Sequence, residues 1–177
     1  MPINVSFYPL LFPDDTWAEI QSTLPGNIEV IREKGKKALL DFLLERVEHY
    51  QFILISRIHN MEFFRQIISG KSELFEGVDI IYDAEALTAH REIMRRSLTQ
   101  KPLTPEEESE LIRNEVEQTK IARSVIAVSH REAKTFLNYG VNNVHVLGHT
   151  IKATPGENLF TERKGFLFVG ALRDDGS

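Results

Sequence analysis

Short apolar runs alternate along this chain with longer segments in which apolar residues recur every three or four positions. The runs are typical of β-strands and cover residues 3–8, 28–31, 52–56, 78–82, 124–128, 144–147 and 165–170. The segments between them are typical of amphipathic helices, most clearly residues 36–50, where Leu39, Leu43 and Val47 follow at intervals of four. Strands alternating with helices predict an α/β fold, a Rossmann-like, doubly wound, mostly parallel sheet with right-handed crossovers.

Helix boundaries are marked by capping residues. Thr104 and Glu107 have the spacing of a capping box, and Ser129 and Glu132 repeat it directly after a predicted strand. Gly140 stands where the second of these helices should end, because glycine readily adopts the left-handed conformation of a helix C-terminus. These residues predict a helix that begins at Thr104 and another that runs from Ser129 to Gly140.

The strand ends are where chemistry is expected. The runs at 52–56 and 124–128 are almost entirely apolar, which predicts strands covered on both faces. Between them, residues 78–96 read as a strand that turns at Asp83 and Glu85 into a helix. Open α/β sheets bind ligands at the carboxyl ends of their strands, so this corner is the leading candidate for a site.

Composition narrows the class of protein. The 177 residues have a formal net charge of −5, which argues against wholesale electrostatic binding of nucleic acid. There is no cysteine, so disulfides and thiolate metal sites are excluded. No apolar run approaches the roughly 20 residues that span a bilayer, and the N-terminal sequence does not resemble a signal peptide. A cytoplasmic α/β protein is expected. No glycine-rich phosphate-binding motif follows any strand.

The order of several short motifs resembles a known family. They are the strand at 28–30 after a Pro-Gly turn, FILISR (52–57), IIYDAEALTAHRE (80–92), SVIAVSHRE (124–132) and FLFVGALRDDGS (166–177). Together they resemble the N-terminal half of a GT-B glycosyltransferase of the retaining type, group 1 or family 4. The resemblance begins at about Ile28 and covers most of the chain from there.

This resemblance implies a domain organisation. Residues 1–150 would form a Rossmann-like acceptor-binding domain, residues 151–164 a linker, and residues 165–177 the first strand of a truncated donor-binding domain. Two family elements are missing: the opening strand with its glycine-rich loop, and the glutamate-pair element that holds the donor. The chain is therefore expected to be an inactive fragment of a glycosyltransferase. Loss of a central strand would leave sheet edges through which copies could form a homo-oligomer.

The resemblance also implies substrates and location. The donor would be a nucleotide-diphosphate sugar, and the acceptor a glycan, a lipid or a small molecule. No further cofactor and no metal are expected. His145 and His149 lie four apart, but in a strand and its loop, which is not the geometry of a zinc site. The parent protein would be cytoplasmic or peripheral at the membrane.

Three candidate residues lie on the corner at 78–96. Asp83 falls where relatives place a group facing the acceptor, so it could orient or deprotonate a hydroxyl as a general base; it could equally cap the following helix. Glu85 is expected in the first helical turn, where the helix dipole favours a carboxylate. Arg91 borders a predicted apolar stripe that includes Met94 and Leu98, and could bind an anionic group or pair with Asp83.

Three further candidates follow the neighbouring strands. Arg57 and His59 come after the strand at 52–56, and His130 comes after the strand at 124–128. Each could contact the acceptor, and each could also be an ordinary loop or helix-start residue.

A second function class stays open at this point. The missing phosphate-binding loop also fits a non-catalytic, flavodoxin-like binding or regulatory domain. Asp14 and Asp15 faintly resemble the acidic pair of a phosphorylated receiver domain.

Overall fold

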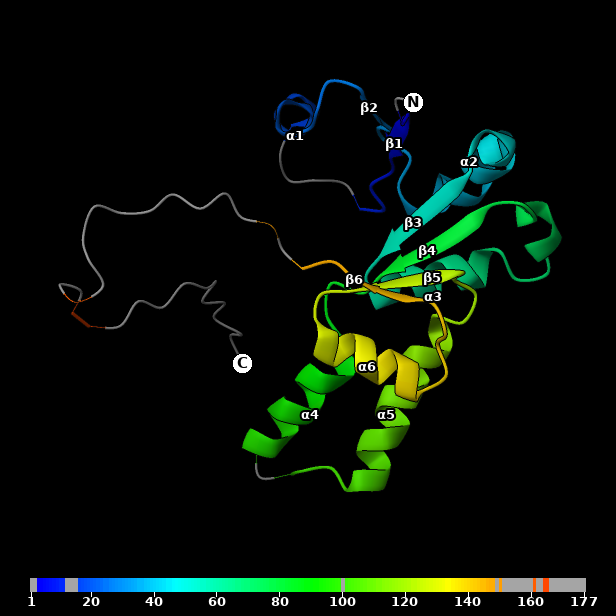
Figure 1. Cartoon of the computed structure of the whole chain (residues 1–177). Coiled ribbons are helices and arrows are strands. Elements are labelled where there is room, and N and C mark those ends of the chain that lie inside the picture. The colour runs from blue at the N-terminus through cyan, green and yellow to red at the C-terminus, as the bar shows by residue number, and fades with distance from the viewer. Residues whose placement is uncertain are drawn as a thin grey trace.

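The protein is an α/β domain built on parallel sheets, as the computed structural model shows (Figure 1). The structure describes residues 3–11, 16–99, 101–148, 150, 161 and 164–165. A two-stranded parallel sheet pairs β1 (Val5–Phe7) with β2 (Ile28–Val30). A four-stranded parallel sheet has the order β3 (Phe52–Ser56), β4 (Asp79–Asp83), β5 (Ser124–Ala127) and β6 (Val144–Val146).

Helices connect the strands, as the alternating pattern predicts. The first two, α1 (Trp17–Thr23) and α2 (Leu39–Arg46), flank β2 along the chain. The crossovers of the larger sheet are made by α3 (Ile58–Ile67), by α4 (Thr88–Leu98) with α5 (Pro105–Gln118), and by α6 (His130–Asn138). Short 3-10 helices in the described ranges are η1 (Lys36–Ala38), η2 (Val47–His49) and η3 (Ser72–Phe75). The predicted single helix over 36–50 is thus three consecutive pieces.

The core lies between one face of the larger sheet and its helices. Tyr82 on β4 and Val125 on β5 are fully buried, as are Met61 on α3 and Phe136 on α6. The rings of Tyr82 and Phe136 meet edge to face with centroids 6.4 Å apart. Burying a side chain of this size contributes about 1.5–3 kcal/mol, so these contacts hold the helices on the sheet.

The opposite face of the same sheet is open among the described residues. Phe52 and Leu54 of β3 are 55% and 57% exposed, and Ile81 and Ile126 are half-buried. The prediction that the strand at 52–56 is covered on both faces is therefore wrong for the part of the chain that is described. Its apolar sequence shows that both faces suit burial, but the sequence does not say what would cover them.

The predicted helix ends are largely confirmed. At the start of α5 the Oγ1 of Thr104 accepts from the amide of Glu107 at 3.2 Å, and the Glu107 carboxylate accepts from the amide of Thr104 at 2.8 Å. Ser129 caps α6, but Glu132 does not complete the box. Gly140 has φ 90° just past the end of α6, as expected for a left-handed terminus.

The start of α4 corrects two predictions. The helix begins at Thr88 and not at Asp83 or Glu85: Asp83 is the last residue of β4, and a loop follows it. Glu85 is therefore not in the first helical turn, and the dipole argument for it fails. The predicted apolar stripe of this helix is not a core face at Met94 and Leu98, which are 65% and 80% exposed.

Other predictions fall outside the described residues. These are the acidic pair Asp14 and Asp15, residue His149, most of the predicted linker and the predicted strand at 165–170. Among the described residues, no helix has the length and apolarity to cross a membrane.

Candidate functional site

The carboxyl ends of β3 and β4 bring polar side chains together. The parallel register pairs Ser56, the last residue of β3, directly with Asp83, the last residue of β4. The Ser56 hydroxyl lies 2.7 Å from Oε1 of Glu85 and 3.3 Å from Oδ2 of Asp83. The other Asp83 oxygen accepts from the Glu85 amide at 3.3 Å. Two carboxylates thus converge on one hydroxyl at the strand ends where α/β folds bind ligands.

Arg57 completes this cluster, which we call the β3/β4 rim (Ser56, Arg57, Asp83 and Glu85). Its Nε donates to Oε2 of Glu85 at 2.8 Å, with the two side chains 61% and 42% exposed. Its backbone amide donates to the Asp83 carbonyl at 3.1 Å. Asn60 supports the rim from α3, donating its side-chain amide to the Ser56 carbonyl at 2.8 Å.

The backbone of the rim is strained at two positions. Arg57 has φ 72° and ψ 143°, and Glu85 has φ 48°. Side chains other than glycine rarely adopt positive φ, and such positions cluster at functional sites, where surrounding contacts hold them. Here the two strained residues are joined to each other by the Arg57–Glu85 ion pair.

The loop between the rim and α4 is held by two glutamates from other helices. Glu115 of α5 is 8% exposed, and its carboxylate accepts from the amides of Thr88 and Ala89 at 2.9 and 2.6 Å. Glu132 of α6 accepts from the amide of Leu87 at 3.0 Å. These carboxylates accept from amides at the positive end of α4, the kind of position at which helices favour anions. The start of α4 is therefore not open to a phosphate.

Sequence reasoning missed both glutamates. For Glu115 a signal exists, because the residue shares the core-facing side of α5 with Ile112, Val116 and Thr119, where a lone carboxylate needs a buried donor. For Glu132 the capping-box spacing with Ser129 predicted that its carboxylate would bond to the backbone at the start of α6. The carboxylate accepts from the Leu87 amide instead.

A buried phenol lies beneath this corner. Tyr82 is fully buried on β4, and burial raises the pKa of its hydroxyl, with the nearby Glu115 carboxylate adding to the shift. Its hydroxyl and Oε2 of Glu132 are buried without a hydrogen-bond partner among the described residues. The phenol therefore stays neutral at physiological pH.

The other predicted site residues are spread along the same end of the sheet. His59, Arg91 and His130 are exposed in the first turns of α3, α4 and α6. Within the described chain no hydrogen bond joins Arg91 to Asp83; the arginine at this corner is Arg57. The described residues contain no group of three His, Cys, Asp or Glu side chains placed to hold a metal ion.

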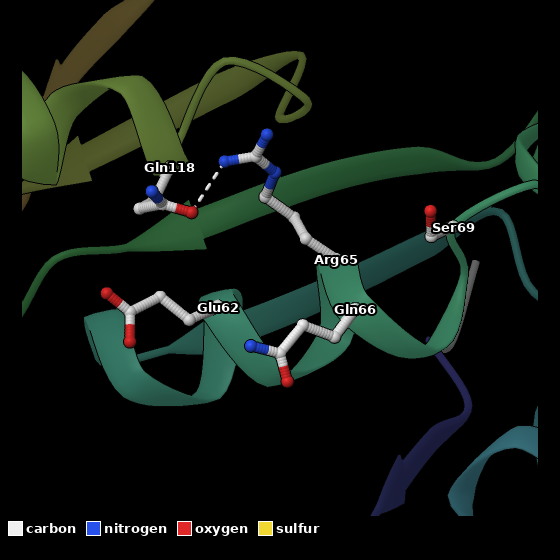
Figure 2. Close-up of a pocket in the computed structure, with 5 residues that line it drawn as sticks. All are labelled: Glu62, Arg65, Gln66, Ser69 and Gln118. Atoms are coloured by element: carbon white, nitrogen blue, oxygen red, sulfur yellow. Dashed lines mark hydrogen bonds between the residues drawn. The ribbon is translucent and has the colours of Figure 1, made fainter.

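Two surface hollows lie away from the rim. Figure 2 shows the first, of about 410 Å³, where Arg65 of α3 reaches across to Gln118 of α5 and donates at 2.6 Å. The second, of about 200 Å³, lies between α4 and α5 and is lined by residues that include Arg96 and Leu103. No rim residue lines either hollow.

Comparisons with known proteins add no assignment. No protein-family model matches the chain, and neither a curated protein nor a solved structure matches it significantly.

Proposed function

We propose that this chain supplies the acceptor-binding half of a retaining GT-B glycosyltransferase. Such an enzyme transfers a sugar from a nucleotide-diphosphate sugar to a glycan, lipid or small-molecule acceptor. The observation that supports the proposal most is the convergence of Asp83 and Glu85 on Ser56 at the carboxyl ends of two parallel strands. The short motifs that resemble the family include these residues.

In this proposal the rim binds hydroxyl groups of the acceptor. Carboxylate oxygens accept hydrogen bonds from sugar hydroxyls, and Asp83, which is half-buried, is the group proposed to orient or deprotonate the attacking one. The acceptor oxygen then bonds to the anomeric carbon as the bond to the diphosphate breaks. Arg57 fixes Glu85 through their ion pair, which limits the rotamers of both side chains.

In this proposal the donor diphosphate is bound away from the start of α4. Glu115 and Glu132 already occupy the amides at the start of α4, so the diphosphate would be bound elsewhere. By the family resemblance, that is the donor-binding domain whose first strand would be residues 165–177.

Substitution of Asp83 in the full parent protein tests the proposal. Asp83→Asn is expected to lower turnover by roughly 10²–10⁴-fold, the usual contribution of general-base catalysis, with the unfolding temperature nearly unchanged. Asp79→Asn is the matched control, because Asp79 lies at the amino end of the same strand, away from the rim, and pairs with the exposed Arg123. Wild-type turnover in Asp83→Asn would remove Asp83 from the mechanism.

The non-catalytic binding domain is the second candidate. The observation favouring it is that neither described hollow opens at the rim. Incubating the parent protein with a panel of nucleotide-diphosphate sugars separates the two, since only the glycosyltransferase would release nucleoside diphosphate. Absence of release with every donor, with acceptors of all three classes present, would favour the binding domain.

A further inference from the structure

The loop between β4 and α4 carries Glu85 of the rim and is held at both ends. At its start the amide of Ala84 donates to the carbonyl of Ile126 at 2.9 Å. At its end the amide of Leu87 donates to Oε1 of Glu132 at 3.0 Å. Ala84 and Leu87 are each 2% exposed. Between them Glu85 has φ 48°, and a strained conformation of this kind persists only where surrounding contacts hold it.

The second oxygen of Glu132 is not used by this contact. Oε2 of Glu132 and the hydroxyl of Tyr82 are both buried, and the described residues supply neither with a hydrogen-bond partner. Tyr82 has no exposed surface at all. A carboxylate oxygen accepts hydrogen bonds and a phenol hydroxyl donates one, so the two buried atoms are complementary.

Both atoms belong to the packing contact between β4 and α6. Phe136 lies four residues after Glu132, on the same side of α6, and its ring meets the Tyr82 ring edge to face. Burial raises the pKa of the Tyr82 hydroxyl most, and nearby carboxylates, Glu132 among them, raise it further. Both oxygens of Glu115 already accept backbone amides. Oε2 of Glu132 is therefore the acceptor that remains for the phenol in the described chain.

We propose that one buried water molecule bridges the Tyr82 hydroxyl and Oε2 of Glu132, and thereby positions the loop that carries Glu85. The water accepts from the phenol and donates to the carboxylate, as buried waters do between polar groups that lack a direct partner. The bridge fixes the Glu132 side chain, which in turn holds the Leu87 amide. This inference concerns how the rim is held and does not rest on the role proposed for the rim in sugar transfer.

The sign of one substitution tests the bridge. Tyr82→Phe removes the hydroxyl and keeps the ring. With the bridge, the equilibrium constant for unfolding should rise roughly three- to tenfold, because a buried hydrogen bond is lost. Without the bridge, the same change would lower that constant, because it removes a buried donor that has no partner. Urea unfolding measures the constant, and a variant at least as stable as the wild type overturns the inference.

A second background tests whether Glu132 is the partner. In a Glu132→Ala chain, Tyr82→Phe should no longer destabilise the fold, since the bridge is already broken. Tyr139→Phe is the matched control, because the Tyr139 hydroxyl lies 3.0 Å from Oγ of Ser109 in a separate contact. Its effect should be the same in both backgrounds. An undiminished effect of Tyr82→Phe in the Glu132→Ala chain excludes Glu132 as the partner.

The water itself is detected in the wild-type chain. A water-selective NOE spectrum should show a cross-peak between a long-lived water molecule and the Tyr82 ring protons. If there is no such cross-peak, the proposed water is excluded, and a direct bond between the two side chains would be the explanation for any coupling between them.

Amide hydrogen exchange tests the positioning role. In Tyr82→Phe the Leu87 amide should exchange roughly three- to tenfold faster, because its acceptor is less firmly held. In Tyr139→Phe, which weakens the fold elsewhere, the Leu87 amide should exchange at the wild-type rate. A Leu87 amide that is unchanged in Tyr82→Phe, or accelerated equally in both variants, would show that the bridge does not position the loop.

Discussion

Arg57 holds a backbone conformation that is close to one reserved for glycine. Its φ of 72° and ψ of 143° follow directly from β3, and the side chain reaches Glu85 across the rim. Such conformations cost a non-glycine residue on the order of 1–3 kcal/mol. An arginine at this position therefore destabilises the backbone locally. Its partly exposed ion pair with Glu85 offsets this strain by at most about 1 kcal/mol.

Replacing Arg57 separates strain from charge. Arg57→Gly should raise the free energy of unfolding by about 1 kcal/mol, because it removes the strain. Arg57→Ala loses the same ion pair but keeps a Cβ, so its stability should stay the same or fall. Urea unfolding of both variants measures the difference, and a glycine variant no more stable than the alanine variant would contradict the strain.

Glu115 is the residue on which the start of α4 most depends. Its carboxylate accepts two backbone amides while almost fully buried. Glu115→Ala leaves both donors without their charged partner and should lower the free energy of unfolding by about 2–4 kcal/mol. Glu115→Gln keeps one good acceptor oxygen and should lose less. Glu117→Ala, at a half-exposed position paired with Lys120, is the control and should change little in urea unfolding.

At the scale of elements, the second half of α4 is held by its own charges. Hydrogen bonds from Arg95, and then from Arg96, lower the pKa of Glu92 from its ordinary 4.5 to about 2. Both arginines lie one turn further along the helix. The Nε of Arg95 is 2.8 Å from Oε2 of Glu92, and the Nε of Arg96 is 2.7 Å from Oε1. Pairs with this spacing stabilise a helix surface, and salt weakens them.

The pH dependence of this network follows from the lowered pKa. The folded state holds the Glu92 proton less tightly than the unfolded state, so its stabilising contribution is present above pH 4.5. That contribution is lost as the pH falls from 4.5 towards 2. A carboxyl NMR titration should give Glu92 a pKa well below its ordinary 4.5. Glu92→Gln should remove this pH dependence, and adding Arg95→Gln to that variant should change nothing further.

At the scale of the whole molecule, the described part of the chain forms two separate parallel sheets. The smaller one is joined to the rest through α2, where the rings of Tyr8 and Phe42 lie 4.8 Å apart and Arg46 pairs with Glu29 at 2.9 Å. Directly before and after β3, the carbonyl of Gln51 accepts from the Asp79 amide and the amide of Arg57 donates to the Asp83 carbonyl, both towards β4. Backbone groups alternate along a strand, so those of Phe52 and Leu54 point to the edge that is unpaired among the described residues.

This open edge supports the proposal that copies of the chain associate. Unpaired strands with exposed apolar side chains are templates for pairing with another chain. Sedimentation velocity should show concentration-dependent association of the wild-type chain, and Leu54→Lys should reduce it by placing a charge at the edge. Leu74→Lys is the control, since Leu74 is 47% exposed on η3 and outside the edge. Equal association of both variants would exclude the β3 edge as the interface.

Much of the fold follows from the sequence because its signals are local. The apolar runs predict the strands, and Thr104 with Glu107 fixes the start of α5 through atoms only three residues apart. Asp83 and Glu85 were predicted to lie at a strand end for the same reason. That Ser56 lies beside them was not predicted, because the pair Ser56 and Asp83 depends on the register of β3 with β4.

The sequence by itself therefore determined the order of strands and helices, the cap of α5 and the position of Asp83 and Glu85 at the end of β4. Only the tertiary structure decided where α4 begins, because the amides at its start are bound by side chains far away along the chain. Glu115 is 26 and 27 residues from the two amides that it binds, and Glu132 is 45 residues from the amide that it binds. The tertiary structure also decided which apolar side chains stay exposed. Periodicity gives the side of an element that suits burial, whereas burial itself requires a second element to pack there.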